Sequence, residues 1–384
     1  MKVAVLGYGT VGAGVYSMLS DAPGMEAGPV LVRPGKAVES FMVSDAALIF
    51  GDPTVDAVVE TLGGLDPAYS YGMRALEAGK HFITANKAMV AAHGLELAAL
   101  AREKGVAFLF SAACGGGVPF LHNLALSAET DRIEAVSGIL NGTTNYMLDA
   151  MQRRSLSYGD ALREAQSLGY AESDPTADVS GLDALRKMQL ACAVAFGVLP
   201  QSGMLCEGME HFTAADVEDI QSRGLVCRLM ARGSRAGESV SAYVEPVLFP
   251  RAAPESSVFT NNNMARYTGK RCGSIVLMGQ GAGRFPTASA VLRDLSAAQQ
   301  GARSMFPENC RAAEADNREA VHSYYIRTGG FAAVRLPLRS VLAQGEVVRA
   351  VTEPMSAEKM HALAQNIRKD GNDLFFAALE EELC

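Results

Sequence analysis

Four carboxylates and a lysine lie close together in the segment from Ala165 to Lys187, AQSLGYAESDPTADVSGLDALRK. Asp183 and Lys187 are four positions apart, so they share one face if the chain is helical there. A lysine held beside a carboxylate can have its pKa tuned and can pass a proton to a bound molecule. The carboxylates upstream, such as Glu172 and Asp178, could receive the ammonium group of a ligand.

Two helices are expected to position these side chains. Gly169-Tyr170 and Asp174-Pro175 end the first helix, because the residue before a proline is disfavoured in the α region. A second helix is expected to start near Val179, and its sequence DALRKMQLACAVAF is apolar enough to be buried. The alternative is that Asp183 and Lys187 form an ordinary ion pair and that the other acids only cap and turn.

A glycine-rich turn at the N-terminus predicts a dinucleotide-binding fold. The strand Lys2 to Leu6 leads into Gly7, Gly9 and Gly12, which are followed by an amphipathic helix to about Leu19. In this fingerprint the first glycine makes the tight turn, the second lets a pyrophosphate approach the backbone, and the third allows close helix packing. Further strands alternate with helices and predict a parallel, doubly wound sheet. These strands are expected at Val55 to Thr61, His81 to Thr84 and Val106 to Ser111.

The end of the second strand, Pro29 to Arg33, bears on the choice of nucleotide. NAD enzymes commonly have an acidic residue there, whereas this chain has Arg33 and, three positions later, Lys36. Two cations favour the 2′-phosphate of NADP. The alternative is that both are solvated loop charges.

Composition excludes several classes of protein. The chain has 384 residues, a net charge of -8 and a pI near 5.4, with no long cluster of lysine and arginine, so nucleic acid is an unexpected partner. No apolar run reaches the roughly 18 residues of a membrane span. The 7 cysteines and 6 histidines are scattered without metal-ligand spacing, which is typical of free thiols in a reducing compartment. We therefore expect a cytoplasmic protein with no membrane contact.

The order of these residues resembles the signature of homoserine dehydrogenases. The resemblance covers roughly residues 1–300, including the triplet Ala85-Asn86-Lys87, the NGTTNY run from Asn141, and the glycines from Gly279 to Gly283. It implies that Lys187 donates a proton to an aldehyde oxygen, with Asp183 and Lys87 as the other catalytic residues. It also implies substrate binding by Glu172, Asp178, Asp183, Gly142 and Thr143, and cofactor binding by Gly7, Gly9, Thr10, Val11, Gly12, Arg33, Thr61, Lys87 and Gly283.

The glycine-rich segment from Ala112 to Pro119 matches a cation site of the family. In relatives it wraps a monovalent cation, Na+ or K+, through main-chain oxygens. The resemblance implies such a site at Ser111, Cys114, Gly116 and Val118, although the family usually has Glu where this chain has Ser111. The residues alone favour a tight turn near the nicotinamide, with Cys114 in the wall of the site.

The chain is expected to form three parts of an α/β protein. These are a Rossmann-type NAD(P)-binding domain (1–130, with a return segment at 284–311), an α+β catalytic and dimerisation domain with an open mixed sheet (131–283), and a small α+β region (312–384). Many relatives carry an amino-acid-binding module of the ACT type at the C-terminus. Here its first helix is expected to be missing, since Gly329-Gly330 and Pro337 interrupt any helical period after the strand His322 to Arg327.

The resemblance thus implies reversible hydride transfer between NAD(P)H, with NADP preferred, and L-aspartate 4-semialdehyde, giving L-homoserine. A homodimer or a higher homo-oligomer is expected. Two alternatives stay open from the residues. One is another Rossmann oxidoreductase acting on a small amino acid, and the other is a non-catalytic nucleotide-sensing regulatory protein.

Overall fold

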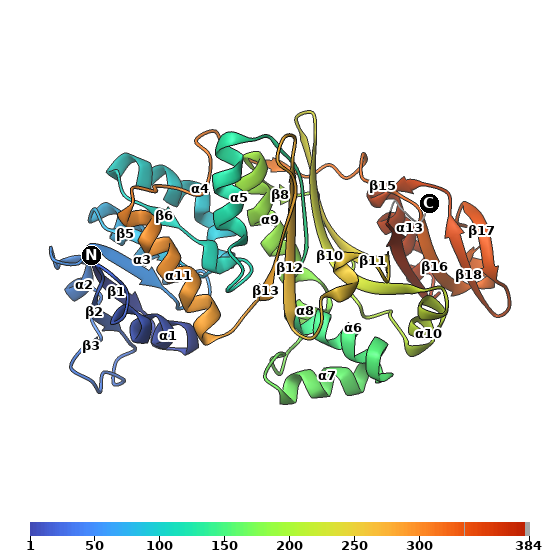
Figure 1. Ribbon diagram of the computed structural model, residues 1–384, viewed down its shortest axis with the longest axis horizontal. Helices are drawn as coiled ribbons and strands as arrows, with labels where there is room; N and C mark the ends of the chain where they lie inside the picture. The colour runs from blue at the N-terminus through green and yellow to red at the C-terminus, as the bar shows by residue number, and fades with distance from the viewer. Residues whose placement is uncertain (334, 381–384) are drawn as a thin grey trace.

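The computed structural model describes residues 1–333 and 335–380. The molecule is elongated, with the N-terminal sheet at one end, a larger sheet in the middle and the C-terminal strands at the other end (Figure 1). The expected α/β architecture, with one parallel sheet and one mixed sheet, is confirmed.

The N-terminal sheet has six parallel strands in the order β3-β2-β1-β4-β5-β6. Its central strands β1 and β4 are buried almost throughout, because helices cover both faces of a parallel sheet. The strands and their helices are β1 (Lys2–Leu6), α1 (Thr10–Leu19), β2 (Glu26–Leu31), β3 (Met42–Val43), α2 (Ala47–Phe50), β4 (Ala57–Glu60), α3 (Ala68–Glu77), β5 (His81–Thr84), α4 (Lys87–Lys104) and β6 (Phe108–Leu109).

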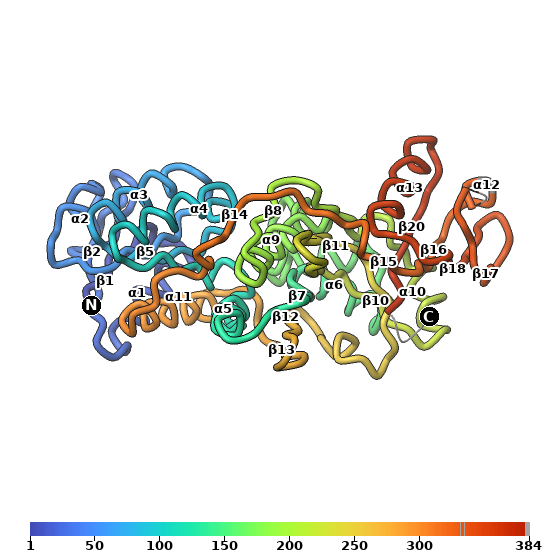
Figure 2. The backbone as a smooth tube through the Cα atoms, turned by 90° about the horizontal axis from the view of Figure 1, so that it is seen from above, coloured from blue at the N-terminus to red at the C-terminus, as the bar shows by residue number. Residues whose placement is uncertain are grey.

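The chain returns to this sheet late in the sequence. Helix α11 (Arg284–Gln299) lies beside α1, as Figure 2 shows. The approach is close at Gly14, where an added Cβ would lie 2.9 Å from the carbonyl oxygen of Arg284. Further along α11, Asp294 accepts hydrogen bonds from the backbone N–H and the hydroxyl of Ser111. The return helix therefore tethers the segment that leaves the N-terminal sheet.

The middle of the molecule contains a mixed sheet with helices packed against it. Helix α9 contacts strands β7, β10 and β11, and helix α6 contacts β10 and β12. The elements are the 3-10 turn η1 (Ser111–Ala113), α5 (Phe120–Thr130), β7 (Ile133–Ile139), α6 (Gly142–Arg154), α7 (Tyr158–Ser167), α8 (Thr176–Val179), α9 (Leu182–Phe196), β8 (Val198–Ser202), β9 (Leu205–Cys206), α10 (Ala214–Ser222), β10 (Leu225–Ala236), β11 (Ser239–Pro250), the 3-10 turn η2 (Pro254–Ser257), β12 (Asn262–Gly269) and β13 (Gly273–Gln280).

Two local expectations need correction, and one hairpin was not expected. The strand expected over Val106 to Ser111 is only β6, because Ser111 already belongs to η1. The buried helix expected from near Val179 is interrupted by Gly181, whose φ of +82° separates α8 from α9. Strands β12 and β13 were not expected, although they form an antiparallel hairpin beside β7.

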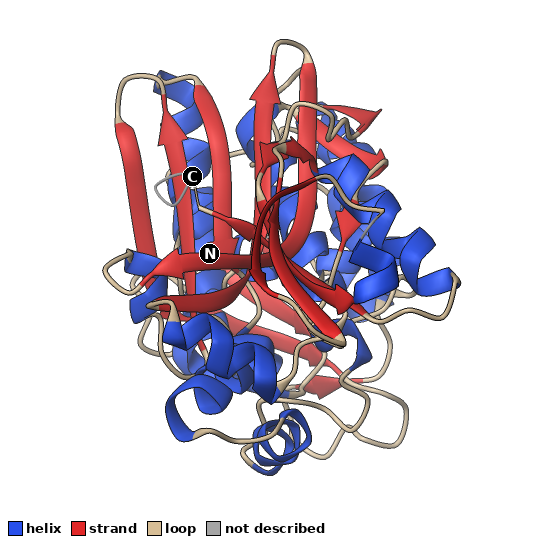
Figure 3. Ribbon diagram, turned by 90° about the vertical axis from the view of Figure 1, so that its right-hand side faces the viewer, coloured by secondary structure: helices blue, strands red, loops and turns tan. Residues whose placement is uncertain are grey.

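The C-terminal strands continue the middle sheet instead of forming a sheet of their own. Strand β20 pairs with β11 in parallel, which gives a ten-stranded sheet ordered β13-β12-β7-β10-β11-β20-β16-β18-β17, with β9 beside β11. Figure 3 looks along the molecule from this end and shows the strands with helices packed among them. The remaining elements are β14 (Arg311–Glu314), β15 (Val321–His322), β16 (Tyr324–Gly329), α12 (Gly330–Ala333), β17 (Leu338–Ala343), β18 (Val347–Thr352), β19 (Met355–Ser356), α13 (Ala357–Lys369) and β20 (Leu374–Leu379).

An ion-pair network joins the C-terminal strands to helix α10 of the middle region. Arg327 on β16 donates from Nε to Asp216 of α10 over 2.7 Å, and its Nη1 donates to Asp373. Asp216 is fully buried, so its charge needs this partner. Among the described residues, β16 is followed directly by the four-residue helix α12, and the loss of a full first helix stays a prediction.

Candidate active site

A cavity of about 580 Å³ lies between the N-terminal sheet, the helices of the middle region and the start of α11. Segments that are far apart in the sequence line it. They are Ala85, Lys87, Ala112, Ala113, Gly115, Gly116, Asn141, Gly142, Thr143, Leu168, Gly169, Tyr170, Glu172, Asp174, Ala177, Asp178, Asp183, Arg186, Lys187, Asn261, Gly281, Ala282, Gly283 and Thr287.

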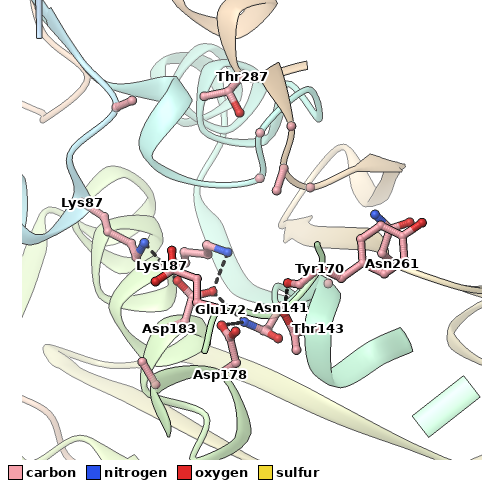
Figure 4. Close-up of a pocket in the computed structure, with 18 of the residues that line it drawn as sticks. Lys87, Asn141, Thr143, Tyr170, Glu172, Asp178, Asp183, Lys187, Asn261 and Thr287 are labelled. Atoms are coloured by element: carbon pink, nitrogen blue, oxygen red, sulfur yellow. Dashed lines mark hydrogen bonds and ion pairs between the residues drawn. The ribbon is translucent and has the colours of Figure 1, made fainter. Parts of the chain in front are cut away.

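Asp183 is the centre of the polar contacts in this cavity. Its Oδ2 accepts from Lys187 Nζ at 2.7 Å, and its Oδ1 lies 3.0 Å from Lys87 Nζ. Lys187 is on the same helix, whereas Lys87 is the first residue of α4, which follows strand β5 of the N-terminal sheet. The two lysines converge on one carboxylate (Figure 4). The pair four residues apart is therefore part of a three-residue cluster that joins two regions of the chain.

The backbone and a side chain at the start of α6 complete the cluster. Lys187 Nζ also donates to the carbonyl oxygen of Leu140 at 2.6 Å. Asn141 Nδ2 donates to Asp183 Oδ2 at 2.9 Å and to Asp178 Oδ1 at 2.7 Å. The other amide atom of Asn141 accepts from the N–H of Thr144 and caps α6. Two of the three N–H donors of Lys187 thus have fixed partners.

These contacts decide the charges of the cluster. Burial alone would raise the pKa of Asp183, but the charges of Lys187 and Lys87 and the bonds from Lys187 and Asn141 hold that pKa well below its usual range. Burial alone would lower the pKa of Lys187, but the adjacent Asp183 outweighs it and raises the pKa above the ordinary lysine value of 10.5. Asp183 is therefore ionised and Lys187 protonated at neutral pH.

The other predicted substrate residues lie around the same cavity. Glu172 and Asp178 line it from the loop before α8 and from α8 itself, and the Asp178 carboxylate accepts a hydrogen bond from Asn141. The hydroxyl of Thr143 donates to the carbonyl oxygen of Tyr170 at 2.6 Å, which holds this loop against α6. Gly142 and Thr143 supply the first N–H groups of α6, which have no partner within a helix. An anion would be stabilised at this point.

A second cavity, of about 1020 Å³, lies along the glycine turn. Gly7 has a φ of +97°, and an added Cβ on Gly12 would lie 2.1 Å from the carbonyl oxygen of Gly7, so both positions require glycine. A Cβ on Gly9 would have no neighbour within 4 Å, which leaves its backbone open to a ligand. Thr10 and Val11 follow as the first residues of α1. These features fit a dinucleotide whose pyrophosphate lies at the helix start.

Both predicted cations, Arg33 and Lys36, line this second cavity and are exposed. Thr61 lines it too, but its hydroxyl donates to the carbonyl oxygen of Leu6 at 3.0 Å and so secures the glycine turn. Gly283, predicted as a cofactor contact, lines the first cavity, with a φ of +124° just before α11. The two cavities share the sheet edge at which β4 and β5 end.

The four residues proposed for a monovalent cation fit one poorly. They contribute no carboxylate, and the carbonyl oxygens of Ser111 and Val118 already accept backbone bonds from Cys114 and Phe120. The described residues contain no group of three or more acidic, histidine or cysteine side chains that could hold a metal ion. Cys114 is fully buried and is not among the residues that line the cavity. Burial raises the pKa of its thiol to about 12, which argues against a nucleophilic role.

Sequence reasoning did not include two groups of the cluster among the site residues. Asn141 was noted as the first residue of the NGTTNY run of the family, but not as a partner of Asp183, and the carbonyl of Leu140 carries no signal in the sequence because any residue type supplies one. The NGTTNY run could have indicated Asn141, since a cap side chain has a free amide N–H₂ that can reach a second partner.

Comparisons with known proteins agree with this geometry. The model of the family "Homoserine dehydrogenase" matches residues 119–296, and that of "Homoserine dehydrogenase, NAD binding domain" matches residues 7–111. A homoserine dehydrogenase of Synechocystis is 37% identical over 319 residues, covering 77% of this chain and 72% of the relative. One from Corynebacterium glutamicum is 38% identical over 314 residues, covering 76% and 70%. The crystal structure of a homoserine dehydrogenase from Thiobacillus denitrificans superposes with a TM-score of 0.87 at 29% identity, covering 99% of this chain and 98% of the other.

Proposed function

The chain belongs to the homoserine dehydrogenase family, and from that premise we propose that Asp183, Lys187 and Lys87 form its catalytic centre. The enzyme interconverts L-aspartate 4-semialdehyde and L-homoserine with a nicotinamide cofactor, a reaction of threonine, methionine and isoleucine biosynthesis. The observation that carries the assignment is the convergence of two lysines on Asp183 in a cavity that the cofactor-binding region also lines.

Lys187 is the proposed proton donor. Asp183 and the carbonyl of Leu140 take up two of its N–H groups, so the third is free to point at the substrate oxygen. When bound, the nicotinamide supplies the hydride for the aldehyde carbon. The raised pKa of Lys187 keeps its proton in place at neutral pH. The developing alkoxide still takes that proton, because alkoxides resemble hydroxide, whose parent water has a pKa of about 15.7.

Lys87 and Asp183 have supporting roles in this proposal. The ammonium group of Lys87, 3.0 Å from Asp183, adds a positive charge where negative charge develops on the substrate oxygen. Asp183 orients both lysines and keeps Lys187 charged. In the direction of homoserine oxidation the roles reverse, and a neutral Lys187 accepts the proton of the alcohol.

The amino-acid end of the substrate is proposed to bind between the carboxylates of Glu172 and Asp178 and the start of α6. Glu172 and Asp178 would receive its ammonium group. The free N–H groups of Gly142 and Thr143 would receive its carboxylate, because a helix start favours an anion. Gly142 cannot be replaced without strain, since a Cβ there would lie 2.8 Å from the carbonyl oxygen of Asn261.

The proposed cofactor is NADP in preference to NAD. Arg33 and Lys36 border the cavity along the glycine turn and would bind the 2′-phosphate. Since the residues near Cys114 fit a cation poorly, no step of the proposed mechanism uses Na+ or K+.

Assembly and location are proposals as well. Strand β13 is an edge of the ten-stranded sheet and exposes Val276 (43%) and Met278 (60%), which supports a homodimer formed by the region 131–283. Within residues 1–333 and 335–380, none of the helices combines the length and apolar character of a membrane span. The cytoplasm remains the proposed compartment, and the three-domain division of the chain remains a proposal.

The test is an assay of NADPH oxidation by the purified protein. The kcat/KM for L-aspartate 4-semialdehyde should be at least roughly a hundredfold higher than for aldehydes without the ammonium or the carboxylate group. Each missing group leaves a polar site of the protein unpaired. Equal rates with an aldehyde that lacks both groups would refute the proposed substrate site, and no oxidation of NADPH or NADH with any of these aldehydes would refute the function.

A further inference from the structure

Glu60, the last residue of β4, is a fully buried carboxylate beside the cofactor cavity. One oxygen, Oε1, accepts from the backbone N–H groups of Leu62 at 2.6 Å and Gly63 at 3.2 Å. The other oxygen, Oε2, accepts from the hydroxyl of Thr84 at 2.5 Å. Thr84 is the last residue of the neighbouring strand β5, so this one side chain joins the loops that follow both strands.

The bonds continue from Thr84 and return to the first loop. The Thr84 hydroxyl accepts from the backbone N–H of Asn86 at 2.9 Å, and Asn86 Nδ2 donates to the carbonyl oxygen of Gly64 at 2.6 Å. Asn86 also caps α4 by accepting from the N–H of Met89. These bonds close a circuit that we call the Glu60 network, formed by Glu60, Thr84, Asn86 and the backbone from Leu62 to Gly64.

The Glu60 network adjoins the cofactor cavity on one side and Lys87 on the other. Leu62 lines the cofactor cavity together with Thr61, which immediately follows Glu60. Asn86 immediately precedes Lys87, which contacts Asp183 in the other cavity. Lys87 is the first residue of α4, so the direction of its side chain depends on where Asn86 starts that helix.

We propose that Glu60 is a positioning residue that holds the cofactor loop and Lys87 in one fixed arrangement through Thr84 and Asn86. Its location gives the physical reason. A buried carboxylate is retained at high desolvation cost only where its oxygens are satisfied, and here three donors from two loops satisfy it. Hydride transfer requires cofactor and substrate to be held within narrow limits, and this network spans the boundary between their two sites.

The proposal rests on the role proposed above for Lys87 and separates into two branches. The Oε1 branch holds the cofactor loop, whereas the Oε2 branch, through Thr84, holds Asn86 and Lys87. Glu60→Ala should therefore weaken NADPH binding and lower kcat, each by roughly 10-fold to 100-fold, because buried donors lose their partner. Thr84→Val keeps the shape of the side chain but removes the hydroxyl, so it should lower kcat by roughly 10-fold and leave NADPH affinity within about threefold of wild type.

Glu60→Gln is the conservative variant. Its amide oxygen can still accept from Leu62 and Gly63, and its N–H₂ can donate to the Thr84 hydroxyl, so it should recover most of both losses. Asp216→Asn is the matched control, because Asp216 is also fully buried and hydrogen-bonded but lies at the C-terminal ion-pair network. It should lower the melting temperature and leave kcat and NADPH affinity unchanged.

Cofactor affinity is measured by NADPH titration of the full-length protein, and kcat by NADPH oxidation with the semialdehyde. The decisive arm is a double-mutant cycle with Lys87→Ala. If Glu60 acts through Lys87, Thr84→Val adds little further loss of kcat in the Lys87→Ala background. The proposal is overturned if the losses of kcat from Thr84→Val and Lys87→Ala multiply in the double variant. It is also overturned if Thr84→Val affects kcat and NADPH affinity equally, or if Asp216→Asn shows kinetic losses of the same size.

Two further outcomes are also decisive. If Glu60→Ala does not fold, Thr84→Val still tests the Oε2 branch, and an unchanged kcat in Thr84→Val overturns the proposal. If the wild type binds NADPH but does not reduce the semialdehyde, the proposed function fails. NADPH titration then decides the cofactor branch alone, which requires weaker binding in Glu60→Ala than in Glu60→Gln.

Discussion

Replacing Asp183 by asparagine removes one charge from the catalytic cluster while keeping its shape. The carboxylate lies 2.7 Å from Lys187 Nζ and 3.0 Å from Lys87 Nζ. At an effective dielectric constant of 20, the gross Coulomb attraction is roughly 6 kcal/mol for each lysine, most of which offsets the desolvation of the charges. Removing one partner from a buried pair costs about 3–5 kcal/mol, because the remaining charges are left uncompensated.

The effect on catalysis has a separate cause. Asp183 orients Lys187 and keeps it charged, so its loss removes general-acid catalysis, which contributes roughly 10²-fold to 10⁴-fold to kcat. We expect a fall of this size in kcat for Asp183→Asn in NADPH oxidation with the semialdehyde. NADPH affinity should stay within about threefold of wild type, because Asp183 does not line the cavity along the glycine turn. Circular dichroism at the assay temperature establishes that the variant is folded.

Asp178→Asn is the matched control for this experiment. Asp178 accepts from the same Asn141 amide but has no direct bond to either lysine. Its loss should therefore raise the KM of the amino-acid substrate and leave kcat within roughly tenfold of wild type. A folded Asp183→Asn variant that retains a tenth of the wild-type kcat, or one that loses NADPH affinity as much as kcat, would refute the assignment of Asp183.

Three other predictions concern protonation, the cofactor and regulation. Homoserine oxidation needs neutral Lys187, whose pKa is raised above 10.5. The kcat/KM for oxidation should therefore rise roughly tenfold per pH unit through pH 8 to 10. A plateau beginning near pH 8 in wild type would show that the lysine pKa is lowered instead. NADPH should bind more tightly than NADH. Arg33→Ala should cost about 1–3 kcal/mol of NADPH binding and leave NADH binding unaffected, as measured by titration of both cofactors. Tighter NADH binding by wild type would contradict this prediction. The enzyme should be insensitive to millimolar threonine, because the helix that directly follows β16 has four described residues, whereas an amino-acid site would need a full helix start. Half-maximal inhibition below a few millimolar would show that a working site survives.

The sequence alone predicted the parts of the site that depend on local geometry. Gly7 and Gly12 follow from backbone conformation and close packing, which leave glycine as the fitting residue. The spacing of Asp183 and Lys187 follows from the helical repeat, and the structure has both on one face of α9. The resemblance of the 165–187 segment to homoserine dehydrogenases named a family that the comparisons confirm.

The local sequence pattern predicted less of the ten-stranded sheet. Strands β12 and β13 were missed, and the C-terminal strands were assigned to a region of their own, although β20 pairs with β11 across more than a hundred residues of chain. The period of a strand predicts which face is buried but does not specify which distant strand will be its neighbour. That choice depends on the edges available once the rest of the sheet has formed.

Only the tertiary structure decided that Lys87 and Lys187 share one carboxylate. Lys87 lies on the N-terminal sheet and Asp183 on a helix of the middle sheet, and no spacing in the sequence relates them. The same holds for the carbonyl of Leu140 on Lys187 and for Glu60 between two loops, because a backbone group or a buried acid is identified by its neighbours in space. The sequence determined which groups were available for the chemistry. The packing of α9 and α11 against the N-terminal region determined the distances between these groups, because such distances depend on contacts between segments far apart in the chain.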